Sequence, residues 1–236
     1  MSGRSIMLKI QTIMFALVVL LTVCGSHQVQ AQFIHPKIKS KETTIRRVVV
    51  MPAKVNVVRD SMKGPEGMAA ESDELSLRVE KMVADVLANK KNVTTLMATA
   101  ASGSEAEAQQ KYNVADFQTK FDALLPNIMK KRSDVKKGRF TMGDEVLNLN
   151  LEKGADAVVF IRGEGKKLTG GKTAFRLLVG GMPAYLQLMI GIVDARNGEV
   201  LLYTDPMFPG DPTTAVDRLR KALEKGFKKL PEVKAQ

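Results

Sequence analysis

The chain of 236 residues has few of the side chains on which most catalytic centres depend. It contains one cysteine, no tryptophan and two histidines, His27 and His35. A single cysteine excludes an internal disulfide, so the fold must be held together by its core. Apolar residues make up 44% of the chain, which is enough for a packed globular domain.

The N-terminal segment has the pattern of a secretory signal. Two basic residues precede a run from Ile13 to Val23 in which only Thr22 is polar. This run is typical of a signal sequence and is too short to span a bilayer, which needs about 20 apolar residues. An A-x-A-like pair ending at Ala31 predicts cleavage after that residue. The expected organisation is a signal peptide (1–31), a flexible leader (32–42), one domain (43–230) and a tail (231–236).

A second processing signal overlaps the first one. The segment from Leu21 to Cys24 approximates the bacterial lipoprotein motif, in which the cysteine is acylated and becomes the first residue. Gly25 and Ser26 suit this motif, whereas Val23 is bulkier than the small residue that usually precedes the cysteine. Lipidation of Cys24 is therefore the alternative to export of a chain without a lipid.

Cleavage after Ala31 would leave a chain with no cysteine and with His35 as its one histidine. Such a chain cannot build a cysteine nucleophile, a cysteine zinc site or a multi-histidine metal site. A serine triad would need His35 as its base, and we expect this histidine to be exposed in the leader. Carboxylate or lysine chemistry remains possible, but the sequence favours a protein that is not an enzyme and has no cofactor or metal.

The order of expected elements is typical of an α/β domain. Strands are expected at 46–51, 55–58, 92–98, 157–161, 175–179, 185–193 and 199–204. Helices are expected near 72–86, 117–128, 144–153 and 214–230, with Ser72 capping the first and Pro126 kinking or splitting the second. We expect two or three layers, in which helices pack on a mixed sheet of about five strands.

The segment Tyr185–Val193 is apolar on both of its faces. Leu188 and Ile190 would lie on one face of a strand, and Met189 and Val193 on the other. This pattern predicts a central strand covered by helices on both sides. The Asn-Gly pair that follows within Asp194–Gly198 predicts a turn into an antiparallel strand.

One stretch resembles a phosphate-binding loop. It runs from Gly165 to Thr173 and ends in Gly-Lys-Thr. The motif requires four residues between its first glycine and the Gly-Lys pair, and it leads into a helix. Here the spacing is one residue longer, and we expect a strand after Thr173. We therefore predict that Lys172 and Thr173 bind no nucleotide.

The excess of positive charge, a formal +11, is concentrated in two places. The first cluster comprises Lys130, Lys131, Arg132, Lys136, Lys137 and Arg139, and the second comprises Lys225, Lys228 and Lys229. Clusters of this sign attract nucleic acid, anionic lipid or acidic polymers. Export makes nucleic acid an unsuitable target, so the expected partners are an envelope protein or an anionic membrane surface. The alternative is a solvated surface without a partner.

Three short motifs resemble a known family. They are the valine-rich strand that ends at Met51-Pro52, the Gly-Ala-Asp-Ala-Val-Val segment from Gly154 to Val159, and the hairpin sequence from Ile192 to Val200. The pattern resembles the curli-secretion lipoproteins and related bacterial envelope-assembly lipoproteins, over roughly Thr43 to Leu230. The resemblance implies an extracytoplasmic α/β domain with a non-catalytic role in secretion or envelope assembly. The chain has a poor lipid motif and no clear membrane hairpins, so the resemblance transfers neither channel formation nor any functional residue.

The expected function is that of a non-catalytic accessory or assembly protein of a bacterial cell envelope. It would be exported and would be periplasmic or peripherally associated with the outer membrane. Two alternatives remain: a secreted enzyme that uses carboxylates or lysines, and a module that binds a small apolar ligand.

Overall fold

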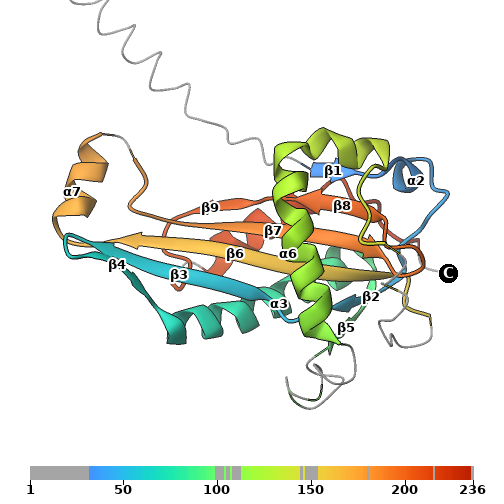
Figure 1. Ribbon diagram of the computed structural model, residues 1–236, viewed down its shortest axis with the longest axis horizontal. Helices are drawn as coiled ribbons and strands as arrows, with labels where there is room; N and C mark the ends of the chain where they lie inside the picture. The colour runs from blue at the N-terminus through green and yellow to red at the C-terminus, as the bar shows by residue number, and fades with distance from the viewer. Residues whose placement is uncertain are drawn as a thin grey trace, which may run out of the picture.

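The computed structural model describes residues 32–98, 104, 107, 113–143, 146, 154–179, 181–214 and 216–234, and across these residues nine strands form one sheet (Figure 1). The strands are β1 (Gln32–Ile34), β2 (Arg47–Val50), β3 (Lys54–Ser61), β4 (Gly64–Gly67), β5 (Thr94–Met97), β6 (Ala157–Leu168), β7 (Ala184–Asp194), β8 (Val200–Thr204) and β9 (Met207–Pro209). The helices are α2 (Pro36–Lys39), α3 (Ala69–Lys91), α6 (Val114–Lys130), the 3-10 helix η1 (Arg132–Lys137), α7 (Gly171–Leu178) and α8 (Val216–Gly226).

The main path of the sheet runs β1-β8-β7-β6-β2-β5, with β3 and β4 continuing beside β6 and β9 beside β7. β2 is parallel to β5 and β6, whereas β7 is antiparallel to both β6 and β8. The expected α/β class and mixed sheet are confirmed, but the expected number of about five strands is wrong. The additional strands are short, and β4 consists of residues with weak β-propensity that are held by the hairpin with β3.

Helices cover both faces of the sheet, so the domain has three layers. One core joins α3 and α8 to Leu188 and Ile190 of β7. A second core joins α6 and η1 to Met189 and Val193 of the same strand. In Figure 1, α6 crosses in front of the strands. The prediction that Tyr185–Val193 forms a central strand with two covered faces is therefore confirmed.

The hairpin between β7 and β8 also follows the sequence. Gly198 has a φ of 73°, a left-handed conformation that glycine adopts without a steric cost. Asp194 closes the turn by accepting the backbone N–H of Gly198 at 3.0 Å. The expected turn and the antiparallel return strand are confirmed.

Serine side chains fix α3 against β3. The helix begins at Ala69, one turn before the expected cap Ser72. The hydroxyl of Ser72 instead accepts the backbone N–H of Val57 at 2.9 Å. Ser76 accepts the N–H of Val55 at the same distance. Two amides of the strand are therefore satisfied by the helix that covers it.

The segment 32–42 does not begin as a flexible leader. β1 pairs antiparallel with β8, and α2 follows it directly. Ile34 and Ile38 are buried in the core beneath α3 and α8. Local sequence did not reveal this order, because the strand that pairs with β1 lies near the other end of the chain.

The segment Phe175–Val179, expected as a strand, lies almost entirely in α7. Gly170 has a φ of 61° and reverses the chain after β6, and the helix starts at the next residue. β6 itself continues to Leu168, beyond the expected end at Ile161, because β3 and β7 pair with both of its edges. α7 consequently sits at the far end of the long strands, away from β1 and α6 (Figure 1).

Several predictions concern residues outside the described part of the chain. These are the signal peptide 1–31, acylation of Cys24, and nearly all of the expected helix at 144–153. Pro126 lies inside α6, which continues to Lys130 without being split. Within the described residues, no helix has both the length and the apolar character needed to cross a membrane.

Candidate functional site

The first predicted basic cluster lies where α6 ends and η1 follows. All its members are exposed except Arg132, which is half-buried. Val135 anchors η1 because its side chain is fully buried in the core beneath α6. The short helix therefore presents its basic side chains around one fixed apolar residue.

The second predicted cluster lies at the C-terminal end of α8. Lys225, Lys228 and Lys229 are exposed, whereas Phe227 and Leu230 between and beside them are buried. The amphipathic spacing of the segment thus places the apolar residues in the core and the lysines in solvent.

The edge strand β1 brings these two clusters together. The side chain of Gln32 accepts the backbone N–H of Lys229 at 2.7 Å and donates to the carbonyl of Lys225. The next residue, Phe33, points to the opposite face of the sheet, where the ammonium of Lys136 lies 5.2 Å from the ring centre. The clusters therefore flank β1 from the two faces of the sheet.

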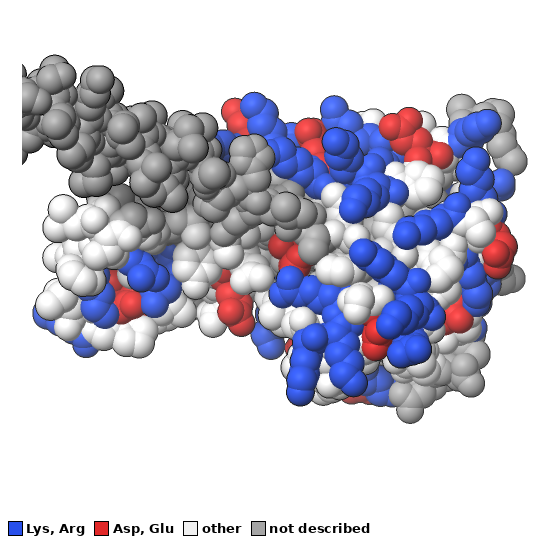
Figure 2. Space-filling model, turned by 90° about the horizontal axis from the view of Figure 1, so that it is seen from above, with Lys and Arg blue, Asp and Glu red and all other residues white. Residues whose placement is uncertain are grey.

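We name the nine residues of the two clusters the basic edge. Figure 2 shows lysine and arginine side chains crowded at this end of the molecule, whereas the opposite end shows fewer charged side chains. The sequence predicted the members of the two clusters, but it did not predict that one edge strand would join them.

Three residues of the basic edge are neutralised by carboxylates. Arg132 lies 2.8 Å from Asp205, and both Lys137 and Arg139 lie within 4.0 Å of Asp134. Burial raises the pKa of the Asp205 carboxyl, and the nearby Arg132 opposes this rise. These pairs hold η1 in place more than they provide a binding surface.

The other six residues keep their charge available. Within the described part of the chain, no carboxylate lies at ion-pair distance from Lys130, Lys131, Lys136, Lys225, Lys228 or Lys229. All six are exposed. The basic edge therefore offers six ammonium groups to an anionic partner, three from each side of β1.

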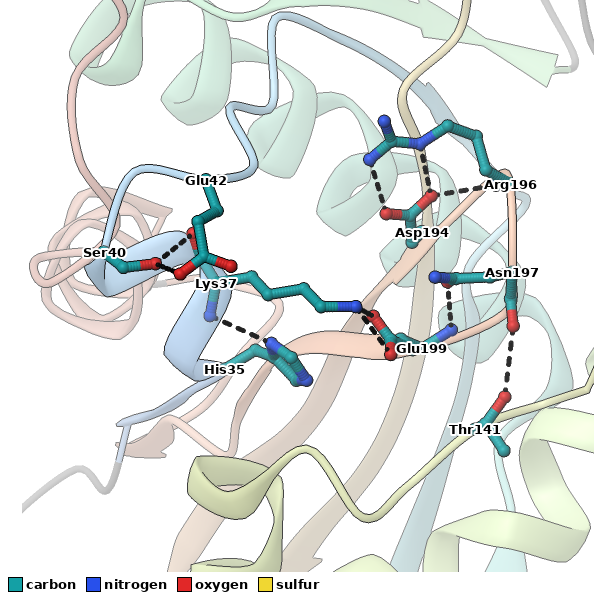
Figure 3. Close-up of polar contacts among 9 residues, drawn as sticks. All are labelled: His35, Lys37, Ser40, Glu42, Thr141, Asp194, Arg196, Asn197 and Glu199. Carbon is teal, nitrogen blue, oxygen red and sulfur yellow. Dashed lines mark hydrogen bonds and ion pairs between the residues drawn. The ribbon is translucent and has the colours of Figure 1, made fainter.

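The segment that carries β1 is locked to the domain by His35, which the sequence placed in an exposed leader. His35 is only 4% exposed, and its Nδ1 accepts the N–H of Lys37 at 3.2 Å to cap α2 (Figure 3). Its Nε2 packs against Gly138, where an added Cβ would lie 2.4 Å away. Burial lowers the pKa of His35, so the ring is neutral near pH 7.

A second contact ties α2 to the β7–β8 turn. The ammonium of Lys37 lies 2.6 Å and 2.9 Å from the two carboxylate oxygens of Glu199 (Figure 3). This pair lowers the pKa of the Glu199 carboxyl. The guanidinium of Arg196 in the same turn donates two hydrogen bonds, of 2.7 Å and 3.0 Å, to the carboxylate of Asp194. The Lys37–Glu199 pair therefore holds α2, which follows β1, to a turn that the Arg196–Asp194 pair keeps ordered.

The Lys172 and Thr173 pair does not belong to a phosphate-binding loop. Residues 165–168 form strand β6 and pair with β7, so their amides do not curl around a ligand. The expected strand after Thr173 is wrong, since both residues lie in the first turn of α7. Lack of nucleotide binding stays a prediction, and among the described residues no group of three or more histidine, cysteine or carboxylate side chains could hold a metal.

A feature that sequence reasoning missed lies beneath α7. Asp60, at the end of β3, is 2.7 Å from the ammonium of Lys166 and 2.5 Å from that of Lys172. Hydrogen bonds from these two lysines lower the pKa of the Asp60 carboxyl. The cluster borders a cavity of about 610 Å³ whose apolar lining includes Leu168 and Phe175.

Comparison with known proteins gives structural neighbours only. No protein-family profile matches the sequence, and no curated protein matches it. The fold is similar to the PelC dodecamer from Paraburkholderia phytofirmans, at 12% identity and a TM-score of 0.37, over 79% of this chain and 88% of that chain. It is also similar to lipoprotein GNA1162 from Neisseria meningitidis, at 12% identity and a TM-score of 0.37, over 78% of this chain and 96% of that chain. At these values no role is transferred, and the resemblance to the curli-secretion family stays a prediction.

Proposed function

We propose that this protein is a non-catalytic accessory protein of the bacterial cell envelope, held at an anionic surface by its basic edge. The observation that carries the proposal is the placement of six unneutralised lysines around one edge strand. Each basic residue close to an anionic leaflet contributes about 1 kcal/mol, so several together give reversible binding. Export, as the sequence predicts, would place this surface beside envelope lipids.

The environment of Asp60 does not favour carboxylate catalysis at the cavity beneath α7. It is the one carboxylate among the described residues that line the cavity beneath α7. Two lysines lower its pKa, and this leaves it a weak base and no proton donor near neutral pH. A secreted carboxylate enzyme would need a carboxyl group with a pKa closer to the working pH, often beside a second one.

The proposal is tested on washed envelopes from cells that express the full chain. Raising the salt to about 1 M shortens the Debye length from about 10 Å to about 3 Å, so electrostatic binding should be lost without detergent. A lipid anchor at Cys24 would resist the same wash. Retention of the protein in high salt would contradict the proposal.

A charge-matched pair of variants separates the basic edge from total charge. The first variant replaces Lys130, Lys131 and Lys136 by glutamine, and the second replaces Lys54, Lys81 and Lys120, which lie on β3, α3 and the middle of α6. Both lose three charges, but only the first removes them beside β1. The first should elute at lower salt than the wild type, and the second should elute with the wild type.

A further inference from the structure

The end of the molecule opposite the basic edge exposes a helix with large apolar side chains. None of the residues of α7 is buried. Phe175 is 66% exposed, Leu177 58% and Leu178 86%, and Met62 in the β3–β4 turn is 75% exposed. Isolated exposed apolar residues are ordinary, but a group of this kind on one short helix indicates a binding surface.

Helical spacing gives α7 two different faces. Lys172, Phe175 and Arg176 line the cavity between the helix and the strands. Leu177 and Leu178 are outside this lining. Of these two, Leu177 lies across the helix from Lys172 and Phe175, because successive residues are about 100° apart around a helix. The helix therefore covers the cavity with one face while its outer face stays open to solvent or to a membrane.

The cavity combines an apolar wall with an excess of positive charge. Lys166, Lys172 and Arg176 contribute three cations against the single carboxylate of Asp60. An ammonium has three donors, so each lysine keeps donors for a ligand after binding Asp60. The stem of Arg176 is held close to Gly181, where an added Cβ would lie 2.6 Å from the Cδ of the arginine.

We propose that the cavity beneath α7 binds an anionic amphiphile, a molecule with one acidic group and an acyl chain. The acyl chain would lie against Leu168, Phe175 and Met62, and the acidic group would lie at the three cations. The volume of about 610 Å³ is within the range of about 300–1,000 Å³ that is common for small-molecule sites. Free fatty acids and anionic phospholipids share this chemistry. The basic edge takes no part in the site, so the two proposals can fail independently.

Binding is tested with oleate, which displaces the fluorescent fatty acid cis-parinarate from the full-length chain. We expect saturable displacement by oleate and displacement by oleyl alcohol that is at least about tenfold weaker, since the alcohol lacks the charge. Phe175→Ser, and separately Lys166→Gln combined with Lys172→Gln, should each weaken oleate binding about tenfold, which corresponds to about 1.4 kcal/mol.

A matched control distinguishes a site from adsorption to an apolar helix. Leu177→Ser removes a side chain of α7 that is exposed to a similar degree as Phe175 but does not line the cavity. Oleate affinity should stay within about twofold of the wild type, and circular dichroism should show an unchanged unfolding temperature for every variant. Absence of saturable binding, or equal loss of binding in Leu177→Ser, would overturn the proposal. The same applies if sedimentation shows that a second copy covers α7 and keeps oleate out.

The source of the amphiphile is assigned with vesicles that contain a fluorescent phosphatidylglycerol. Transfer of the fluorescent lipid to the wild type, but not to the Lys166→Gln, Lys172→Gln double variant, would assign a phospholipid drawn from a membrane. Oleate binding without such transfer would assign a free fatty acid, and both results support the site. The variant in which Lys130, Lys131 and Lys136 are replaced by glutamine should bind oleate as the wild type does. If the basic edge proves not to hold the protein at envelopes, this inference therefore still stands.

Discussion

The side-chain carbonyl of Gln32 accepts the backbone N–H of Lys229 at 2.7 Å, so the first described residue of β1 holds the end of α8. Its amide group also donates to the carbonyl of Lys225. One edge strand thereby fixes the backbone of two lysines, Lys225 and Lys229, whose side chains remain in solvent. The shape of the basic edge depends on this contact.

Replacing Gln32 by alanine should destabilise the domain. The substitution removes the partner of the Lys229 N–H, whereas the carbonyl of Lys225 still accepts the N–H of Lys228 at 3.2 Å. An unmet hydrogen bond in a partly buried site costs about 1–3 kcal/mol. We expect the free energy of unfolding in urea to fall by about 1–3 kcal/mol. The comparison is Asn56→Ala, which removes an exposed amide from β3 and should change stability by less than about 0.5 kcal/mol. Equal stability of the two variants would contradict the role given to Gln32.

Gly191 is required by the close approach of α6 to β7. A Cβ at this position would lie 2.5 Å from the ring of Phe121, which stacks on Phe160 at a ring-centre distance of 5.0 Å. Gly191→Ala should therefore cost about 1–3 kcal/mol through overpacking. Gly67→Ala is the control, because nothing lies within 4 Å of its added Cβ. If both variants unfold at the wild-type urea midpoint, α6 adjusts to the added methyl group without cost, and this prediction is wrong.

His35 should make the domain less stable in mild acid. Burial lowers its pKa in the folded state below the value of 6.5 that holds in the unfolded chain. Between these two pKa values the unfolded state binds more protons, so the contribution of His35 to stability is present above pH 6.5 and is lost as the pH falls through the folded pKa.

The measurement is the free energy of unfolding between about pH 7.5 and about pH 5. His35→Asn keeps an acceptor for the N–H of Lys37 and removes the titrating ring. We expect a smaller loss of stability in acid for this variant than for the wild type. The charged groups that act on His35 in the wild type, Glu199, Asp194, Glu42 and Lys37, are all retained in the variant, so the difference between the two curves reports on His35. Identical curves would contradict the assignment.

The exported chain is predicted to begin at Gln32. Intact-mass measurement of the purified protein should give the mass of residues 32–236 without a lipid. A mass that corresponds to an acylated Cys24 at the N-terminus would reject this prediction and would place the protein in a membrane leaflet through its lipid.

Elements with a strong local pattern were predictable from the sequence. β2 has a dense run of valines, α3 has apolar residues at helical spacing, and the β7–β8 turn contains Asn-Gly. Each of these signals depends on residues that are neighbours in the chain. The structure accordingly has these elements close to their expected positions.

Elements that depend on distant partners could not be predicted in this way. β1 is a strand because β8 pairs with it, and His35 is buried because Gly138 leaves room for its ring. A strand is expected at 175–179 because these residues form an apolar run, and this run obscures the helical spacing of Lys172 and Arg176. That spacing was the available signal for α7. The lysines of the basic edge were visible in the sequence, but their arrangement around β1 required the long-range contacts of Gln32 and Phe33.

Binding of the full-length chain to vesicles tests the central claim most directly. Flotation with vesicles of phosphatidylcholine, with or without phosphatidylglycerol, should show binding to the anionic vesicles only, and this binding should disappear as the salt is raised. Neutralising Lys130, Lys131 and Lys136 should weaken the partitioning by about tenfold or more, since each charge contributes about 1 kcal/mol, whereas the control variant of Lys54, Lys81 and Lys120 should bind as the wild type does. Equal binding of the two variants, or binding that persists in high salt, would contradict an electrostatic attachment through the basic edge.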